Sequence, residues 1–146
     1  MKIMTTRFGE VDVKDTSCFE FEKPILGYEN EKSFVLIEHK DKSCFTWLQS
    51  VTNPDLAFVL TMAGLFDIDY TIEIPSEVQE MLEIEDADDI LVFNIVVIPQ
   101  GNPRLSSINL LAPIILNINN QKGAQLVLSG TKYVVDHPLF KDKEKC

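Results

Sequence analysis

The sequence predicts a mainly β protein, an antiparallel β-barrel-like or sandwich single domain with one short amphipathic helix at about 76–83. Three observations predict this class. Apolar and polar residues alternate with period two from Phe66 to Ile74, most apolar runs are short, and turn signals such as Asn53-Pro54-Asp55 separate them. A chain of 146 residues usually forms one domain. We expect it over 1–140, followed by a charged, frayed tail at 141–146.

The predicted strands follow one another with few residues between them. In order they are Lys2–Phe8, Glu10–Val13, Cys18–Phe21, Ser33–Glu38, Phe45–Val51, Leu56–Thr61, Phe66–Ile74, Ile90–Ile98, Leu110–Ile118 and Ala124–Leu128. The run Ile90–Ile98 is apolar apart from Asn94, which is typical of a central strand covered on both faces. We therefore expect Asn94 to be buried with hydrogen-bond partners.

One helix is predicted between the segments Phe66–Ile74 and Ile90–Ile98. Ser76 with Gln79 three residues later matches a capping box, in which Ser76 is the N-cap. At 100° per residue the apolar residues of this segment fall on one face and its glutamates on the opposite face. The apolar face holds Val78, Met81 and Leu82, and the polar face holds Glu77, Glu80 and Glu83. We expect the helix to pack on the barrel and expose its carboxylates.

The acidic residues are concentrated in the middle of the chain. There are 23 acidic and 13 basic residues, a formal charge of −10, yet no Lys, Arg or His occurs between Lys42 and Arg104. That window contains Asp55, Asp67, Asp69, Glu73, Glu77, Glu80, Glu83, Glu85, Asp86, Asp88 and Asp89. Because neutralising phosphates requires Lys and Arg, neither nucleic acid nor an anionic membrane is expected as a direct partner. A basic protein is the expected partner, and a solvated face that keeps the protein soluble is the alternative.

Motifs for chemistry are absent from the sequence. His39 and His137 occur in no zinc-binding spacing, and there is no P-loop, dinucleotide fingerprint or nucleophile elbow. We therefore expect no catalytic residue, no cofactor and no metal. The alternative is a small enzyme of β-barrel fold that uses carboxylates and a divalent metal, with Asp86, Asp88 and Asp89 as ligands. A thermal shift with Mg²⁺, Mn²⁺, Ca²⁺ or EDTA separates the two, because a ligand of the folded state raises its stability.

Two features favour a cytoplasmic location. The N-terminus has no apolar signal segment, and nowhere do 18 apolar residues run together. The three widely spaced cysteines, Cys18, Cys44 and Cys146, do not describe a disulfide framework, which favours a reducing compartment.

The segment Leu110–Ile118 has two apolar faces. Leu110, Ala112, Ile114, Leu116 and Ile118 form the expected inward set. Leu111, Pro113 and Ile115 lie on the other face, and since Pro113 cannot donate to a β-ladder, an edge strand or bulge is expected. An open second face would be an apolar patch for a partner's helix or added strand. There are two alternatives to an open patch on a monomer. The protein's own loops cover this face, or the face is the interface of a homo-oligomer.

Five motifs in register resemble the FliW family of flagellar assembly factors, from Met1 to about Phe140. They are Phe45-Thr46-Trp47-Leu48-Gln49-Ser50 followed by Asn53-Pro54-Asp55-Leu56-Ala57-Phe58-Val59, Asp69-Tyr70 with Ile74-Pro75, Asn109-Leu110-Leu111-Ala112-Pro113-Ile114, and Lys132-Tyr133 with His137-Pro138-Leu139. The stretch Phe21–Tyr28 departs from the family's Phe-Pro-x-Gly-Leu-Pro-Gly-Phe pattern.

The resemblance implies a non-enzymatic, chaperone-like protein that binds the C-terminal region of flagellin and, alternatively, CsrA, a small RNA-binding dimer that represses translation of flagellin mRNA. Capture of CsrA would relieve that repression. We place CsrA on the acidic residues Asp67, Asp69, Glu73, Glu77, Glu80, Glu83, Glu85, Asp86, Asp88 and Asp89, and flagellin on Asn53, Asp55, Leu111, Pro113 and Ile115. Replacing Ile115 with Asp is expected to abolish flagellin binding and leave the fold intact.

Overall fold

The structure is a computed structural model in which residues 1–38 and 44–140 are described. His39, Cys146 and the predicted tail at 141–146 lie outside these residues. The strands are β1 (Lys2–Thr5), β2 (Gly9–Asp12), β3 (Cys18–Lys23), β4 (Ser33–Glu38), β5 (Thr46–Ser50), β6 (Ala57–Thr61), β7 (Ile90–Val97), β8 (Ser107–Ile108), β9 (Ile114–Asn117), β10 (Lys122–Gln125) and β11 (His137–Pro138). The helix is α1 (Ser76–Met81), and the 3-10 turns are η1 (Asp15–Ser17), η2 (Ala63–Phe66), η3 (Ala87–Asp89) and η4 (Pro103–Leu105).

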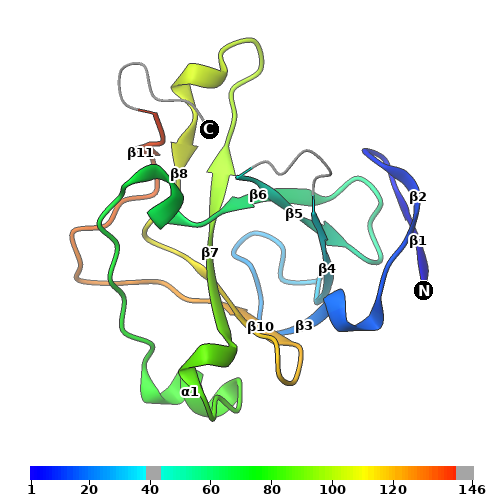
Figure 1. Ribbon diagram of the computed structural model, residues 1–146, viewed down its shortest axis with the longest axis horizontal. Helices are drawn as coiled ribbons and strands as arrows, with labels where there is room; N and C mark the ends of the chain where they lie inside the picture. Colours follow the sequence, from blue (N-terminus) through cyan, green and yellow to red (C-terminus); the bar gives the residue numbers. More distant parts are fainter. Residues whose placement is uncertain (39–43, 141–146) are drawn as a thin grey trace.

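Seven strands close into a barrel (Figure 1). Their order is β7-β6-β5-β4-β3-β10-β9, and β9 returns to pair with β7 from Ile90↔Asn117 to Phe93↔Ile114. All of these pairs are antiparallel except that between β3 and β10. The C-terminal end of β7, which follows the residues that pair with β9, pairs with β8. Strand β8 in turn pairs with β11. The predicted fold class is confirmed, and β8 and β11 are short strands that the sequence pattern did not predict.

Aromatic and aliphatic side chains fill the barrel. Its buried cluster contains Phe19, Phe21, Ile25, Phe34, Leu48, Leu60, Phe93, Ile114 and Leu116. Packing is tight where β10 crosses this cluster, because a Cβ added at Gly123 would lie 2.9 Å from side-chain atoms of both Leu116 and Phe21. Glycine at this position therefore leaves room on β10 for the side chains of Leu116 from β9 and Phe21 from β3.

The alternating segment Phe66–Ile74 is not a strand. Phe66 ends η2, Asp67 has a left-handed backbone (φ 57°), and residues 68–75 belong to no sheet. Burial nevertheless alternates along the segment, with Ile68, Tyr70, Ile72 and Ile74 packed on the barrel. The alternation identified which side chains face inward, but it did not provide a neighbouring strand. Instead, the Tyr133 hydroxyl accepts from the backbone N–H of Thr71 (3.0 Å) and donates to its carbonyl (3.1 Å).

The predicted helix is present with a different N-terminal cap. Val78 and Leu82 are buried and the glutamates exposed, as expected. The N-cap is Pro75 rather than Ser76, no side chain caps the first turn, and the Gln79 side chain donates to the carbonyl of Ile74 (2.7 Å). The capping-box prediction is therefore wrong, because the amide of Gln79 binds the chain before the helix.

The structure does not support the inference that we drew from cysteine spacing. Cys18 carries a free thiol, but Cys44 is disulfide-bonded, so cysteine spacing gives no support for a reducing compartment. Across residues 1–38 and 44–140, no helix has the length and apolar character needed to cross a membrane.

Candidate partner-binding surfaces

The acidic residues of the central window lie on the surface. All ten predicted for CsrA are exposed except Asp89, which is half-buried. Seven of them lie on α1, on η3 or in the chain between these two elements, and we call them the α1 acidic surface. They are Glu77, Glu80, Glu83, Glu85, Asp86, Asp88 and Asp89. A hollow of about 420 Å³ lies on this surface between α1 and the chain that follows it, lined by Glu80, Glu83 and Glu85 among others.

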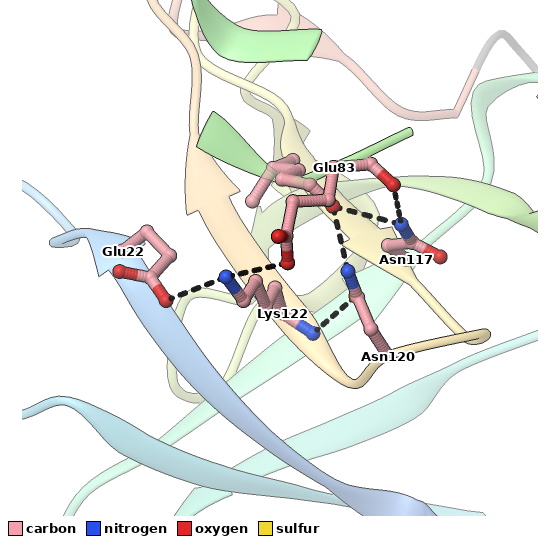
Figure 2. Close-up of polar contacts among 6 residues, drawn as sticks. Glu22, Glu83, Asn117, Asn120 and Lys122 are labelled. Atoms are coloured by element: carbon pink, nitrogen blue, oxygen red, sulfur yellow. Dashed lines mark hydrogen bonds and ion pairs between the residues drawn. The ribbon is translucent and has the colours of Figure 1, made fainter. Parts of the chain in front are cut away.

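The C-terminus of α1 is fixed to the hairpin between β9 and β10 (Figure 2). The buried carbonyl of Leu82 accepts from the side-chain amides of Asn117 and Asn120, each at 2.9 Å. Glu83 then adopts a left-handed backbone (φ 51°), a conformation usually occupied by glycine after a helix. These amides satisfy a helix carbonyl that has no partner within the helix, so they hold the acidic surface in place.

Lys122 brings a positive charge into the α1 acidic surface. Its ammonium lies 2.8 Å from a Glu83 carboxylate oxygen and 3.6 Å from one of Glu22 (Figure 2). The hydrogen bond between Lys122 and Glu83 lowers the pKa of Glu83 and raises that of Lys122. Residues 43–103 contain no basic residue, but the surface that they form does carry one, because β10 supplies Lys122 from outside this segment.

Asp67 and Asp69 lie in a different environment from α1. They line a hollow of about 290 Å³ together with Lys132, His137 and Leu110. Basic side chains from the C-terminal part of the chain thus lie beside these two carboxylates. The acidic residues that we assigned to one partner from the sequence are thus divided between the α1 acidic surface and this mixed hollow. Glu73, which lies between the two groups in the sequence, is exposed.

Two tyrosines attach the 68–75 segment to the barrel beside this hollow. The Tyr70 hydroxyl donates to the carbonyl of Leu110 (2.6 Å), and the Tyr70 and Tyr133 rings meet edge to face at 4.7 Å. Burial raises the pKa of Tyr70 to about 12. Asn94 is buried as predicted, and its amide donates to the carbonyl of Asn109 (3.0 Å).

The open apolar patch expected at Leu111, Pro113 and Ile115 is not present. Ile115 is 0% exposed and Pro113 is buried, while Leu111 is half-buried. Helix α1 and the 68–75 segment cover this face, where Ile115 packs in one cluster with Val78 and Leu82. On the expected inward face, Ile118 is 48% exposed because it lies beyond the end of β9. The expectation that Ile115→Asp leaves the fold intact is therefore wrong.

Asn53 and Asp55 form the turn between β5 and β6. The Asn53 side-chain oxygen accepts from the backbone N–H of Asp55 (3.0 Å), and the Asp55 carboxylate accepts from the Thr6 hydroxyl. This turn lies beside the β1–β2 hairpin, well apart from α1 in Figure 1. The structure therefore does not bring Asn53 and Asp55 together with Ile115.

The sequence interpretation missed several polar residues that shape these surfaces. Asn117, Asn120 and Lys122 position the end of α1, and Gln49 supports the β5–β6 turn. For Asn117 and Gln49 the signal was a side-chain amide at a strand position that is buried in the fold, as in the case of Asn94. In the part of the chain that the structure describes, no group of three or more His, Cys, Asp or Glu side chains could hold a metal ion, so the metal-dependent alternative gains no support.

Comparisons with known proteins identify a family. A family model described as FliW protein matches residues 2–139. The flagellar assembly factor FliW of Moorella thermoacetica is 39% identical over 142 residues, which cover 97% of this chain and 90% of the relative. That of Caldicellulosiruptor bescii is 41% identical over 135 residues, 92% of this chain and 88% of the relative. A crystal structure of the flagellar assembly factor FliW matches with a TM-score of 0.89 at 31% identity, covering 99% of this chain and 100% of the other.

Proposed function

Because this chain belongs to the FliW family of flagellar assembly factors, we propose that it is a cytoplasmic, non-enzymatic protein that binds flagellin and, alternatively, CsrA. Bound CsrA is then withdrawn from flagellin mRNA, so translation of flagellin resumes. In this proposal the chain acts on RNA only through a protein, which agrees with a net charge that repels phosphate.

The observation that carries the CsrA proposal is the α1 acidic surface. An RNA-binding regulator must be cationic where it meets phosphate, so the same face of CsrA is attracted to exposed carboxylates. Lys122 offsets part of the charge at Glu83, but Glu77, Glu80 and the carboxylates of η3 have no ion pair among the described residues. We propose these as the docking surface, with Asp67, Asp69 and Glu73 adding long-range attraction.

For flagellin we retain Asn53 and Asp55 as contact residues. They lie at a turn with exposed groups, whereas Pro113 and Ile115 are covered by the protein's own chain. Because the two proposed surfaces are built from different elements, competition between the partners arises from the bulk of the bound proteins or from a coupled change in this chain.

The test is a competition experiment with purified proteins. The chain is immobilised, loaded with CsrA and then titrated with monomeric flagellin. We expect each partner to bind alone and flagellin to release CsrA. Stable retention of both partners on one molecule contradicts the mutually exclusive mechanism, and failure to bind either partner contradicts the proposed function.

A further inference from the structure

A hollow of about 320 Å³ lies where the tip of the β1–β2 hairpin meets β5 and β6. It is lined by Thr6, Arg7, Gln49, Pro54, Asp55 and Ala57. Its walls are joined by hydrogen bonds, because the backbone N–H of Thr6 donates to the carbonyl of Pro54 (2.9 Å) and the Thr6 hydroxyl donates to the Asp55 carboxylate. The hollow is therefore a built feature of two turns.

Gln49 is 0% exposed and only half of its side-chain amide is satisfied. Its Nε2 donates to the carbonyls of Ser50, Asn53 and Pro54 at 3.1, 3.2 and 3.3 Å. Three acceptors around one end of the amide fix that end as nitrogen. The Oε1 atom is consequently an acceptor, and it has no hydrogen-bond partner among the described residues. A buried polar atom without a partner is rare in native proteins, and here it lies on a side chain that lines a hollow.

The charges at the rim restrict what can bind there. The guanidinium of Arg7 lies 4.2 Å from the ring centroid of Trp47, so a donor group is held on one side. The carboxylate of Asp55 lies on another wall as an acceptor. A cationic side chain gains Asp55 but is opposed by Arg7, and a carboxylate gains Arg7 but is opposed by Asp55 and has no hydrogen to give Gln49. A neutral carboxamide meets all three groups, since its NH₂ donates to Gln49 and Asp55 and its oxygen accepts from Arg7.

We infer that this hollow binds the side-chain carboxamide of an Asn or Gln residue of flagellin, an inference that rests on the proposed binding of flagellin. The site includes Asp55, already proposed as a contact, and adds Arg7, Gln49 and Ala57. It differs in kind from the α1 acidic surface, because a neutral ligand is recognised by hydrogen bonds and shape rather than by net charge.

The test measures the affinity of monomeric flagellin for four forms of the full chain. Ala57→Leu fills the hollow, Arg7→Ala removes the donor, and Glu80→Gln on the α1 acidic surface is the matched control. We expect the first two variants to weaken flagellin binding about 10- to 100-fold, the loss expected for a charge-assisted hydrogen bond, while the control binds like wild type. The affinity of wild type should change little between about 0.1 and 0.5 M salt, where the Debye length falls below about 5 Å.

CsrA binding and the thermal midpoint of each variant control for damage to the fold. Both should stay at wild-type values in Ala57→Leu and Arg7→Ala. Flagellin affinities within about twofold of wild type in both variants overturn the inference and indicate that the hollow holds only water. Wild-type chain that fails to bind flagellin at all contradicts the proposed function itself, which is visible before any variant is measured.

Flagellin supplies the second half of the test. Each Asn and Gln of its C-terminal region is replaced by Leu in turn, and one replacement should weaken binding as much as Arg7→Ala. Combining that replacement with Arg7→Ala should add little further loss, because both remove the same contact. Fully additive losses at every Asn and Gln position contradict recognition of a carboxamide in this hollow.

Discussion

The attachment of α1 to the β9–β10 hairpin can be tested by truncating Asn117 and Asn120 to Ala, singly and together. Both amides donate to the carbonyl of Leu82, so either one alone leaves that carbonyl with a partner. Loss of both leaves a buried helix carbonyl without a donor. The two substitutions are therefore expected to be coupled.

The expected magnitudes follow from the hydrogen bonds removed. Asn117 is 1% exposed, and its truncation loses the donor to Leu82 and the acceptor for the backbone N–H of Asn119 (3.0 Å), about 2 kcal/mol. Asn120 is half-buried and loses the donor to Leu82 and the acceptor for the backbone N–H of Lys122 (3.1 Å), about 1 kcal/mol. The double variant should lose an additional amount of about 1–3 kcal/mol, the cost of a buried carbonyl without a partner.

Equilibrium unfolding in urea measures this coupling. The single tryptophan, Trp47, reports unfolding of the barrel, and equal slopes of free energy against urea for the four proteins would show that the unfolded reference state is unchanged. We expect the double variant to be less stable than the sum of the single changes predicts. Additivity within about 0.5 kcal/mol would refute a shared role at the Leu82 carbonyl.

Three further predictions concern packing and pH. Ile115→Asp should abolish folding, measured by circular dichroism, because a carboxylate in this dry cluster costs about 4 kcal/mol or more. Gly123→Ala should lower the free energy of unfolding by about 1–3 kcal/mol in urea, because its Cβ meets Leu116 and Phe21 at 2.9 Å. Tyr70 loses its proton near pH 10 when unfolded and only near about 12 when folded, so stability should fall between these values. The full shift corresponds to about 2.7 kcal/mol, which partial exposure reduces to about 1 kcal/mol, and Tyr70→Phe should remove this alkaline loss.

Most of the fold could be predicted because side-chain alternation and turn residues are local signals. Ser33–Glu38 was predicted with the bounds it has in the structure, and Asn94 was correctly expected to be buried. Its Nδ2 has a partner as expected, but its Oδ1 has none among the described residues. The segment 66–74 shows the limit of this reasoning. Any extended chain over a core alternates its side chains, whereas a strand also needs a neighbour, and the period carries no information about neighbours.

The surfaces were less predictable because they depend on which distant segments meet. Ile115 has the same alternating pattern whether its outer face is open or covered, and only the position of α1 decides between them. Lys122 is distant from the acidic window in sequence but reaches Glu83 through the β9–β10 hairpin. Gln49 was part of a recognised motif, but the burial of its Oε1 without a partner depends on the segments packed around it, which the sequence does not reveal.

The central claim, that the α1 acidic surface receives CsrA, is tested most directly by the association rate of CsrA as a function of salt. Wild type is compared with a variant in which Glu77, Glu80 and Glu85 are replaced by Gln. These carboxylates are exposed, so the replacements should leave the fold intact. Between about 0.05 and 0.5 M salt the wild-type rate should fall tenfold or more, and the variant should start lower and depend less on salt. An association rate that is the same at both salt concentrations, or the same in both proteins, contradicts the claim.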